Sequence, residues 1–468
     1  MSSSSVENQV AKSDSAVADA KQIDYSAQKL FRHPSYRYMP QFPNTFGQAI
    51  SLGSSQIAST INLPPEVFNL SQSYLCFTLN LPAVAGKYIW YYTDVIAPVG
   101  HIQHYCQTNQ YIVDIDNANK YMKAIKKDIP LKELMTMDPI NGLSISNSPA
   151  NVVPALRNGN SIGGGPAPSS RSFTESSYFQ CGALNTAVAI NLVVPLNLYR
   201  NSFLAVDKDV YYGITSYLRI YWDVLSRICY QSTSNADPSA GAPEAYTGAA
   251  TITNLQLMLA VENNMKIAED VKARHLAGLS YVIPYVQNFK NPNNNQTQSI
   301  SLQFDLGWGI TLAKVYHQVY NNTESLDTAY DCSNNGTLVD GSSNAVANQK
   351  VQQYYTQLNG KREQDLTLDC TYSGGVFTDY MYMKRQLIGS SIESLNAFQF
   401  NWVHVSDYVM ADTDGDNVIG GIPLTSAPIT WTFYGSRMTS ANYQHYTFAV
   451  FYRKLVLNGN GAVVQAGN

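Results

Sequence analysis

Apolar and polar residues alternate with a period of two along much of the chain. Between residues 74 and 81, Leu75, Phe77, Leu79 and Leu81 fall on one face of an extended segment, and Tyr, Cys, Thr and Asn fall on the other. This alternation is typical of a half-buried antiparallel strand, because successive side chains point to opposite faces of a sheet. The same pattern recurs at 217–222, 255–261, 300–306, 398–402, 429–433 and 446–457. Such strands, separated by Gly, Pro, Asn and Ser, predict an all-β sandwich or barrel.

Three segments show a helical repeat instead: 118–125, 351–358 and 264–275. The first precedes Pro130 and the second precedes Gly360, both of which are natural ends for a helix. The strand near residue 75 and the helix near residue 121 have counterparts near residues 300 and 351, so both recur about 230 residues later. This recurrence indicates a duplicated unit of about half the chain. The helix over 264–275 lies between the two copies and is interpreted as a linker.

These patterns predict the division of the chain. We expect an N-terminal arm (1–50), a first β unit (51–262), a linker helix (263–278), a second β unit (279–460) and a C-terminal tail (461–468). The arm is rich in aromatic residues and Pro near its end and has little periodicity, so it should become ordered only along another surface. Long loops are expected at 148–170, 232–248 and 331–348, where Gly, Ser and other turn formers accumulate.

Composition limits the classes of function. The chain has 468 residues, with 30 Lys and Arg against 34 Asp and Glu, for a net charge of −4. A near-neutral surface argues against a protein that neutralises phosphates, so we expect no sequence-specific nucleic-acid binding. There is no export signal, and no segment approaches the about 20 apolar residues of a membrane span, which favours a soluble compartment with reduced, buried cysteines. The 33 Tyr predict extensive surface contact.

An ordered set of segments carries a family resemblance. The set comprises 68–75, 113–117 leading into a helix, 194–196 and 204–212 in the first half, and 281–286, 354–365 and 400–402 in the second. They include Val113-Asp114-Ile115-Asp116-Asn117, Val194-Pro195-Leu196 and Asn359-Gly360-Lys361-Arg362. In this order they resemble double jelly-roll major capsid proteins of icosahedral double-stranded DNA viruses, and most nearly those of virophages and Polinton-like viruses. The resemblance covers nearly the whole chain.

The resemblance implies two tandem eight-stranded jelly rolls that stand perpendicular to a capsid surface. Three subunits would form a pseudo-hexameric capsomer, because two similar sandwiches per chain give a trimer six similar corners. The implied partners are two further copies of the chain, neighbouring capsomers, and minor capsid and vertex (penton) proteins. The implied location is the virion, after synthesis in the cytoplasm or nucleus of a host cell. No catalytic residue or cofactor is implied.

The segment Asp412-Thr413-Asp414-Gly415-Asp416-Asn417 is the sharpest local motif. The carboxylates of Asp412, Asp414 and Asp416 alternate around a glycine and have the ligand type that Ca²⁺ prefers, so a calcium loop is one interpretation. The glycine is not at the sixth position, and the twelfth residue is Pro423 where a helix–loop–helix calcium site needs Glu. We favour the alternative, an acidic hairpin tip.

Other constellations give weaker indications of chemistry. His101, His104 and Cys106 are zinc ligand types without a fourth ligand nearby, and strand positions explain them better. No phosphate-binding loop and no GxSxG nucleophile motif is present. Four carboxylates could converge in a cleft for sugar cleavage, although nothing marks them as more than solvated strand ends and turns: Asp365, Asp369, Asp379 and Glu393. Three arm residues, Arg32, Tyr36 and Arg37, are interpreted as inter-subunit contacts rather than nucleic-acid contacts.

We therefore predict a structural protein and not an enzyme: a viral major capsid subunit that buries surface against copies of itself. The alternative from another class is a tandem β-sandwich that binds or cleaves carbohydrate. A second alternative, a minor capsid or vertex protein, resembles a single jelly roll, and the duplication argues against it.

Overall fold

Strands dominate the structure, a computed structural model that describes residues 35–45, 47–92, 98–106, 110–125, 178–182, 184–233, 244–290, 299–321, 353–370, 373–386, 402–409, 420–425, 427–436 and 443–465. The described strands form five sheets, and the α-helices among these residues are α3 (Ala118–Ile125), α6 (Met265–Leu276) and α7 (Ser373–Gln386). The strands pair in antiparallel fashion, as the alternating pattern predicts.

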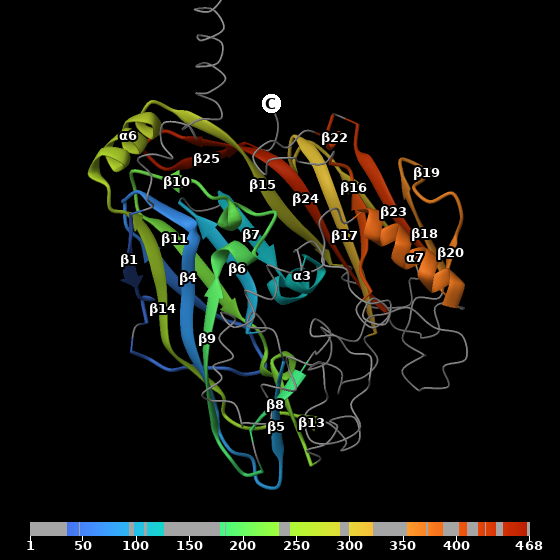
Figure 1. Ribbon diagram of the computed structural model, residues 1–468, viewed down its shortest axis with the longest axis horizontal. Coiled ribbons are helices and arrows are strands. Elements are labelled where there is room, and N and C mark those ends of the chain that lie inside the picture. Colours follow the sequence, from blue (N-terminus) through green and yellow to red (C-terminus); the bar gives the residue numbers. More distant parts are fainter. Residues whose placement is uncertain are drawn as a thin grey trace, which may run out of the picture.

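Two facing sheets make up the first half of the chain (Figure 1). One has the order β1-β14-β4-β10, with β2 paired to β14 and β9 paired to β4. Its strands are β1 (Tyr36–Gln41), β2 (Ile50–Ser51), β4 (Phe68–Leu81), β9 (Val188–Pro195), β10 (Asp209–Val210) and β14 (Thr251–Glu262). The other has the order β3-β11-β6-β7, built from β3 (Ile57–Leu63), β6 (Val99–Tyr105), β7 (Tyr111–Asp116) and β11 (Ser216–Trp222).

A smaller third sheet lies at one end of this half, at the bottom of Figure 1. Its order is β13-β12-β5-β8, with β5 (Tyr88–Tyr92), β8 (Tyr178–Gly182), β12 (Cys229–Ser232) and β13 (Glu244–Ala245). These strands come from three separate connections between strands of the two main sheets. The predicted loop at 232–248 thus contributes β13 to a sheet, and residues 148–170 lie outside the described residues.

The second half repeats this arrangement. One sheet has the order β15-β24-β17-β21, with β22 paired to β17 and β25 to β24, and the other has the order β16-β23-β18-β19, with β20 paired to β18. The strands of the first are β15 (Leu279–Lys290), β17 (Thr311–Asn321), β21 (His404–Asp407), β22 (Ile422–Pro423), β24 (Tyr443–Leu457) and β25 (Ala462–Gln465). Those of the second are β16 (Ser299–Phe304), β18 (Gln353–Leu358), β19 (Lys361–Arg362), β20 (Leu368–Asp369) and β23 (Ile429–Ser436).

The matching strand orders define two jelly rolls in tandem, so the predicted all-β double jelly-roll fold is confirmed. β1, β14 and β4 occupy in the first jelly roll the places of β15, β24 and β17 in the second. β7 and α3 likewise correspond to β20 and α7, because each helix follows the outermost strand of the second sheet. The predicted equivalence of strand 75–81 with strand 300–306 is wrong, since the first lies in β4 and the second in β16, the counterpart of β3.

The predicted helix over 351–358 is wrong, because these residues include strand β18. Asn359 and Gly360 follow with φ values of +49° and +76°. Two successive residues with positive φ make the type I′ turn of a two-residue hairpin, here between β18 and β19. Gly360, interpreted as the end of a helix, is therefore a hairpin residue. The helix of this half lies later, at α7.

The pairing of the end strands extends both jelly rolls into the predicted arm and tail. β1 pairs along its length with β14, from Tyr36 opposite Glu262 to Gln41 opposite Leu257. β25 pairs with β24. Residues 36–41, 50–51 and 462–465 thus belong to the sheets, while residues 1–34 lie outside the described residues. α6 lies within the predicted linker range and begins at Asn264, whose side chain accepts hydrogen bonds from the backbone N–H groups of Lys266 and Ile267.

The inward faces of the strands form the core. In β4 the apolar positions Leu75, Phe77, Leu79 and Leu81 are buried and the alternate positions are half-buried, as predicted. Phe77 packs edge-on against Trp222 of the facing sheet, with ring centroids 5.0 Å apart. The second jelly roll is filled in the same way, by rings that include Trp431, Phe433 and Phe451. Burial of such rings is the main stabilising contribution to both sandwiches.

A glycine contact joins the first jelly roll to the end of the second. Gly213 has φ +74°, and a Cβ added there would overlap the backbone carbonyl of Gly459. We expect Gly213→Ala to lower the free energy of unfolding by about 3 kcal/mol, through strain at positive φ and displacement of this backbone. Gly86→Ala is the matched control: its φ is +70° but nothing lies within 4 Å, so only the conformational cost of about 1 kcal/mol remains. If urea denaturation showed the same loss of unfolding free energy for both variants, the contact between Gly213 and Gly459 would be contradicted.

Candidate assembly surfaces

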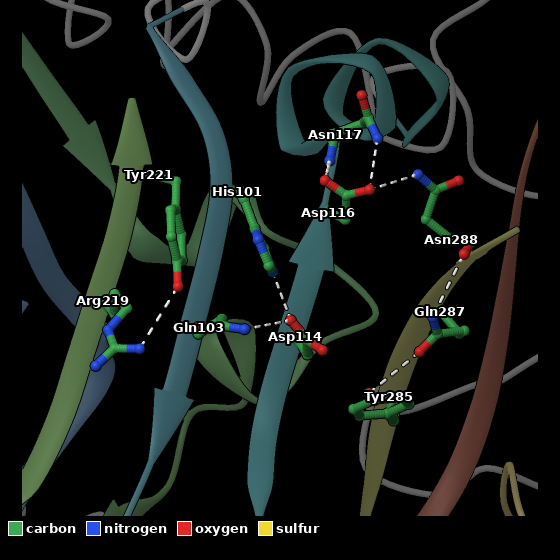
Figure 2. Close-up of polar contacts among 10 residues, drawn as sticks. All are labelled: His101, Gln103, Asp114, Asp116, Asn117, Arg219, Tyr221, Tyr285, Gln287 and Asn288. Carbon is green, nitrogen blue, oxygen red and sulfur yellow. Dashed lines mark hydrogen bonds and ion pairs between the residues drawn. The ribbon is translucent and has the colours of Figure 1, made fainter. Parts of the chain in front are cut away.

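A seam joins the two jelly rolls where β7 lies beside β15 (Figure 2). Asn288 of β15 donates a hydrogen bond to Asp116 Oδ2 of β7 over 3.4 Å. The carboxylate of Asp116 also accepts from the backbone and side-chain nitrogens of Asn117, over 2.8 and 2.7 Å. Asn117 has φ +51°, which turns the chain from β7 into α3. The seam residues thus fix where the helix begins.

α3 fills the space between the jelly rolls (Figure 1). Tyr121 packs against Tyr316 of β17 and Phe448 of β24, with ring centroids 6.2 and 5.2 Å apart. The ammonium of the fully buried Lys120 lies 3.9 Å from the ring centroid of Tyr446. α3 of the first jelly roll therefore docks on the outward face of a sheet of the second.

The outward faces of the β3 and β16 sheets carry the same arrangement of rings. In the first, Tyr105 stacks on its cross-strand neighbour Tyr217 at 5.3 Å, and Arg219 lies over Tyr105. In the second, Tyr355 stacks on Tyr434 at 4.8 Å, and the guanidinium carbon of Arg362 lies 3.9 Å from the Tyr355 ring centroid. The tyrosine excess is thus used in part to build ordered aromatic surfaces on both jelly rolls.

The zinc ligand types at 101–106 do not converge. His101 lies on the outward face of β6, where Nε2 is 2.5 Å from Asp114 Oδ1 and the ring stacks on Tyr221 (Figure 2). His104 points into the core, where Nε2 lies 2.9 Å from the Tyr212 hydroxyl, and burial lowers its pKa to about 4. The two-residue period of a strand separates positions 101 and 104. Within the described ranges, no group of three metal-ligating side chains occurs.

The carboxylates considered for sugar cleavage do not share a cleft among the described residues. Asp379 of α7 is fully buried, where it accepts hydrogen bonds from the Tyr354 hydroxyl over 2.5 Å and from the Trp402 indole over 3.0 Å. Asp369 accepts from the Gln353 amide, and Asp365 is exposed. Asp379 was expected at a solvated strand end; it lies instead in the core, because α7 carries it there. Glu393 lies outside the described residues.

Some of the remaining residues singled out from the sequence lie outside the described residues, and others have structural roles. Asp412, Asp414 and Asp416 lie outside the described residues, as does Arg32. Tyr36 anchors β1 to the sheet, because its hydroxyl donates to Asp209 Oδ1 over 2.8 Å. In the part of the chain that the structure describes, no helix is long and apolar enough to cross a bilayer.

Sequence reasoning missed a polar cluster inside the second jelly roll. His317 and His445 are fully buried and in contact, with Nε2 and Nδ1 3.2 Å apart, and His404 lies nearby against Tyr354. Burial and the neighbouring His445 lower the pKa of His317 well below its usual range, and burial lowers that of His404 to about 3. A signal was present in the sequence for His317, because apolar residues lie two positions away on the same face of its strand, Val315 and Val319.

The fold is that of a double jelly roll, and comparisons with solved structures agree. The chain is similar to the PBCV-1 virus capsid (TM-score 0.54, 10 % identity, 93 % of this chain and 98 % of that chain). It is similar to PBCV-1 VP54 fitted into a reconstruction of the virophage Sputnik (TM-score 0.53, 10 % identity, the same coverage). The mavirus major capsid protein aligns with TM-score 0.48 and 9 % identity, over 93 % of this chain and 91 % of that chain.

No protein-family model matches the chain, and no curated protein matches it in sequence. At 10 % identity, the likeness to the solved structures defines the fold.

Proposed function

We propose that the protein is the major capsid subunit of an icosahedral double-stranded DNA virus, a structural protein without catalytic activity. Three copies would form a pseudo-hexameric capsomer that tiles the shell of the virion. The capsomer would contact neighbouring capsomers and minor capsid and vertex proteins. Synthesis would take place in the cytoplasm or nucleus of a host cell.

One observation carries the proposal: two jelly rolls with the same strand order lie side by side in one chain. A chain with two similar units can form six similar corners from three copies, which suits a near-hexagonal lattice. The alignment with the PBCV-1 capsid over 93 % of the chain supports this role. The carbohydrate alternative gains no support, because the described carboxylates Asp365, Asp369 and Asp379 do not converge.

The mass of the purified protein in solution tests the proposal. Light scattering should give a trimer of about three times the 51.7 kDa chain mass. Negative-stain images of the same peak should show a three-fold particle with a hexagonal outline. A protein that stays monomeric at all concentrations would contradict the capsomer, and binding to a glycan array would then favour the carbohydrate alternative.

A further inference from the structure

The two equivalent helices α3 and α7 differ in exposure. Every α3 side chain that the structure describes is buried, even that of Lys120. α7 buries Asp379 and Met383 in its own jelly roll, but Phe377 is 51 % exposed. Phe377 is the fifth residue of α7, and Tyr121 is the fourth residue of α3. An aromatic side chain thus stands at a similar place in both helices, covered in one and exposed in the other.

The outward faces of the two corresponding sheets also differ in exposure. α3 covers the outward face of the β15-β24-β17 sheet, where Tyr316, Tyr446 and Phe448 are fully buried. The equivalent face of the first jelly roll belongs to β1, β14 and β4. There Tyr38 is 47 % exposed, its ring centroid lies 5.6 Å from that of Tyr74, and Tyr74 itself is only half-buried.

The layers follow one another in a fixed order across the molecule (Figure 1). From left to right, β1, β14 and β4 come first, β6 and β7 follow, α3 lies in the middle, β24 and β17 come next, and α7 lies beside β23 and β18 in the right half of the view. The exposed sheet face and the exposed helix thus lie on opposite sides of the chain. Within the chain, one contact of this kind already exists: α3 packs on the outward face of the β15-β24-β17 sheet.

We propose that α7 of one copy docks through Phe377 on the outward face of β1, β4 and β14 of a second copy, as α3 docks within the chain. The inference rests on the proposed capsomer and names the surfaces that hold it together. The contact is head-to-tail, because the two faces differ and lie on opposite sides. If each step turns the next jelly roll by the same angle, six jelly rolls close the ring at three chains.

Other exposed apolar side chains flank both faces. Leu366, between β19 and β20 and thus close in sequence to α7, is 77 % exposed, and Phe42, directly after β1, is 41 % exposed. The counterparts of these strands, β7 and β15, are in contact within the chain. Large apolar side chains that gather at two complementary faces are typical of a protein interface.

Two single substitutions test the docking. Phe377→Arg damages the helix side and Tyr38→Arg damages the sheet side, so each should weaken self-association by about 30-fold or more per interface. Met265→Arg is the matched control, because Met265 is 76 % exposed on α6, a helix that belongs to neither proposed face, and the substitution should leave the trimer intact. Light scattering over a dilution series reads the assembly, and far-UV circular dichroism with thermal melting verifies that each variant is folded.

A mixture of the two variants tests the head-to-tail geometry. Phe377→Arg protein retains an intact sheet face and Tyr38→Arg protein retains an intact α7, so a 1:1 mixture should form heterodimers through one sound interface and stop there. Trimers of Phe377→Arg as stable as wild type would overturn the inference while leaving the capsomer proposal in place. A wild-type chain that never trimerises would instead refute the capsomer itself.

Hydrogen exchange covers the case of a variant that does not fold. On wild-type protein, trimer formation should slow exchange in residues 373–386 and 36–42 and leave residues 265–276 unchanged. Slowing that spares α7 and β1 would overturn the docking.

Discussion

Asp379→Ala is expected to lower the free energy of unfolding by about 3–5 kcal/mol, one of the two largest effects of those predicted here. The carboxylate is fully buried and accepts hydrogen bonds from Tyr354 and Trp402, and the Cys370 thiol donates to the same carboxylate over 3.4 Å. Alanine would leave these donors buried without their acceptor. Because Asp379 joins α7 to the core, the second jelly roll should also lose its ordered helix. Urea denaturation at neutral pH measures the effect.

Asp365→Ala is the control, because Asp365 is an exposed carboxylate in the same jelly roll. Its loss should change the free energy of unfolding by less than about 0.5 kcal/mol. A similar small effect for Asp379→Ala would mean that the three donors find other acceptors, and the buried carboxylate would then have no structural role.

Acidification from pH 7 to pH 5 is expected to destabilise the fold by about 2 kcal/mol for each buried histidine. Burial lowers the pKa of His104 and His275 to about 4 and that of His404 to about 3, and His317 lies well below its usual range. Unfolded imidazoles titrate near pH 6.5, so between about 6.5 and 4 the unfolded chain binds protons that the folded chain does not. Stability is therefore complete above pH 6.5 and lost as the pH falls. His104, His275 and His404 together amount to roughly 6 kcal/mol at pH 5, comparable with the stability of a domain, and His317 acts in the same direction.

Denaturation at several pH values and one fixed protein concentration gives the slope of stability against pH. His104→Gln should reduce the slope between pH 6.5 and 5 by about one proton. A slope that His104→Gln leaves unchanged would show that this imidazole binds its proton equally well in the folded and the unfolded chain.

The alternation of apolar residues was sufficient to predict the fold class, because a half-buried strand imposes a two-residue period that helices and loops do not share. Residues 75–81, 217–222 and 255–261 lie in strands with the predicted inward faces. The resemblance predicted two jelly rolls, and the strand orders confirm them. The calcium loop at Asp412, Asp414 and Asp416 stays a prediction.

The type and place of individual strands and helices within each half were harder to predict, for physical reasons. Leu358 lies four residues after Tyr354 and three after Tyr355, a spacing that fits a helix face as well as two faces of a strand. The Asn359-Gly360 turn and cross-strand pairing decided the outcome. α7 was missed because Ser373-Gly374-Gly375 begins it without a helical signature, and its buried carboxylate depends on a tertiary contact. The correspondence between α3 and α7 depends on the positions of these helices in the two jelly rolls, which the sequence pattern alone does not give.

The closing pair of strands in each jelly roll sets the order in which the protein can fold. β1 pairs with β14 and β15 pairs with β24, so each sandwich joins its first strand to its last main strand across more than 150 intervening residues. Contacts between residues so far apart in sequence incur loop-closure entropy before they contribute stability, which makes folding slow. During synthesis, β14 is available before β15 begins, so the first sandwich can close while the second is still being made. Until then its unpaired strand edges are exposed, and this is the stage at which premature association would lead to aggregation instead of assembly.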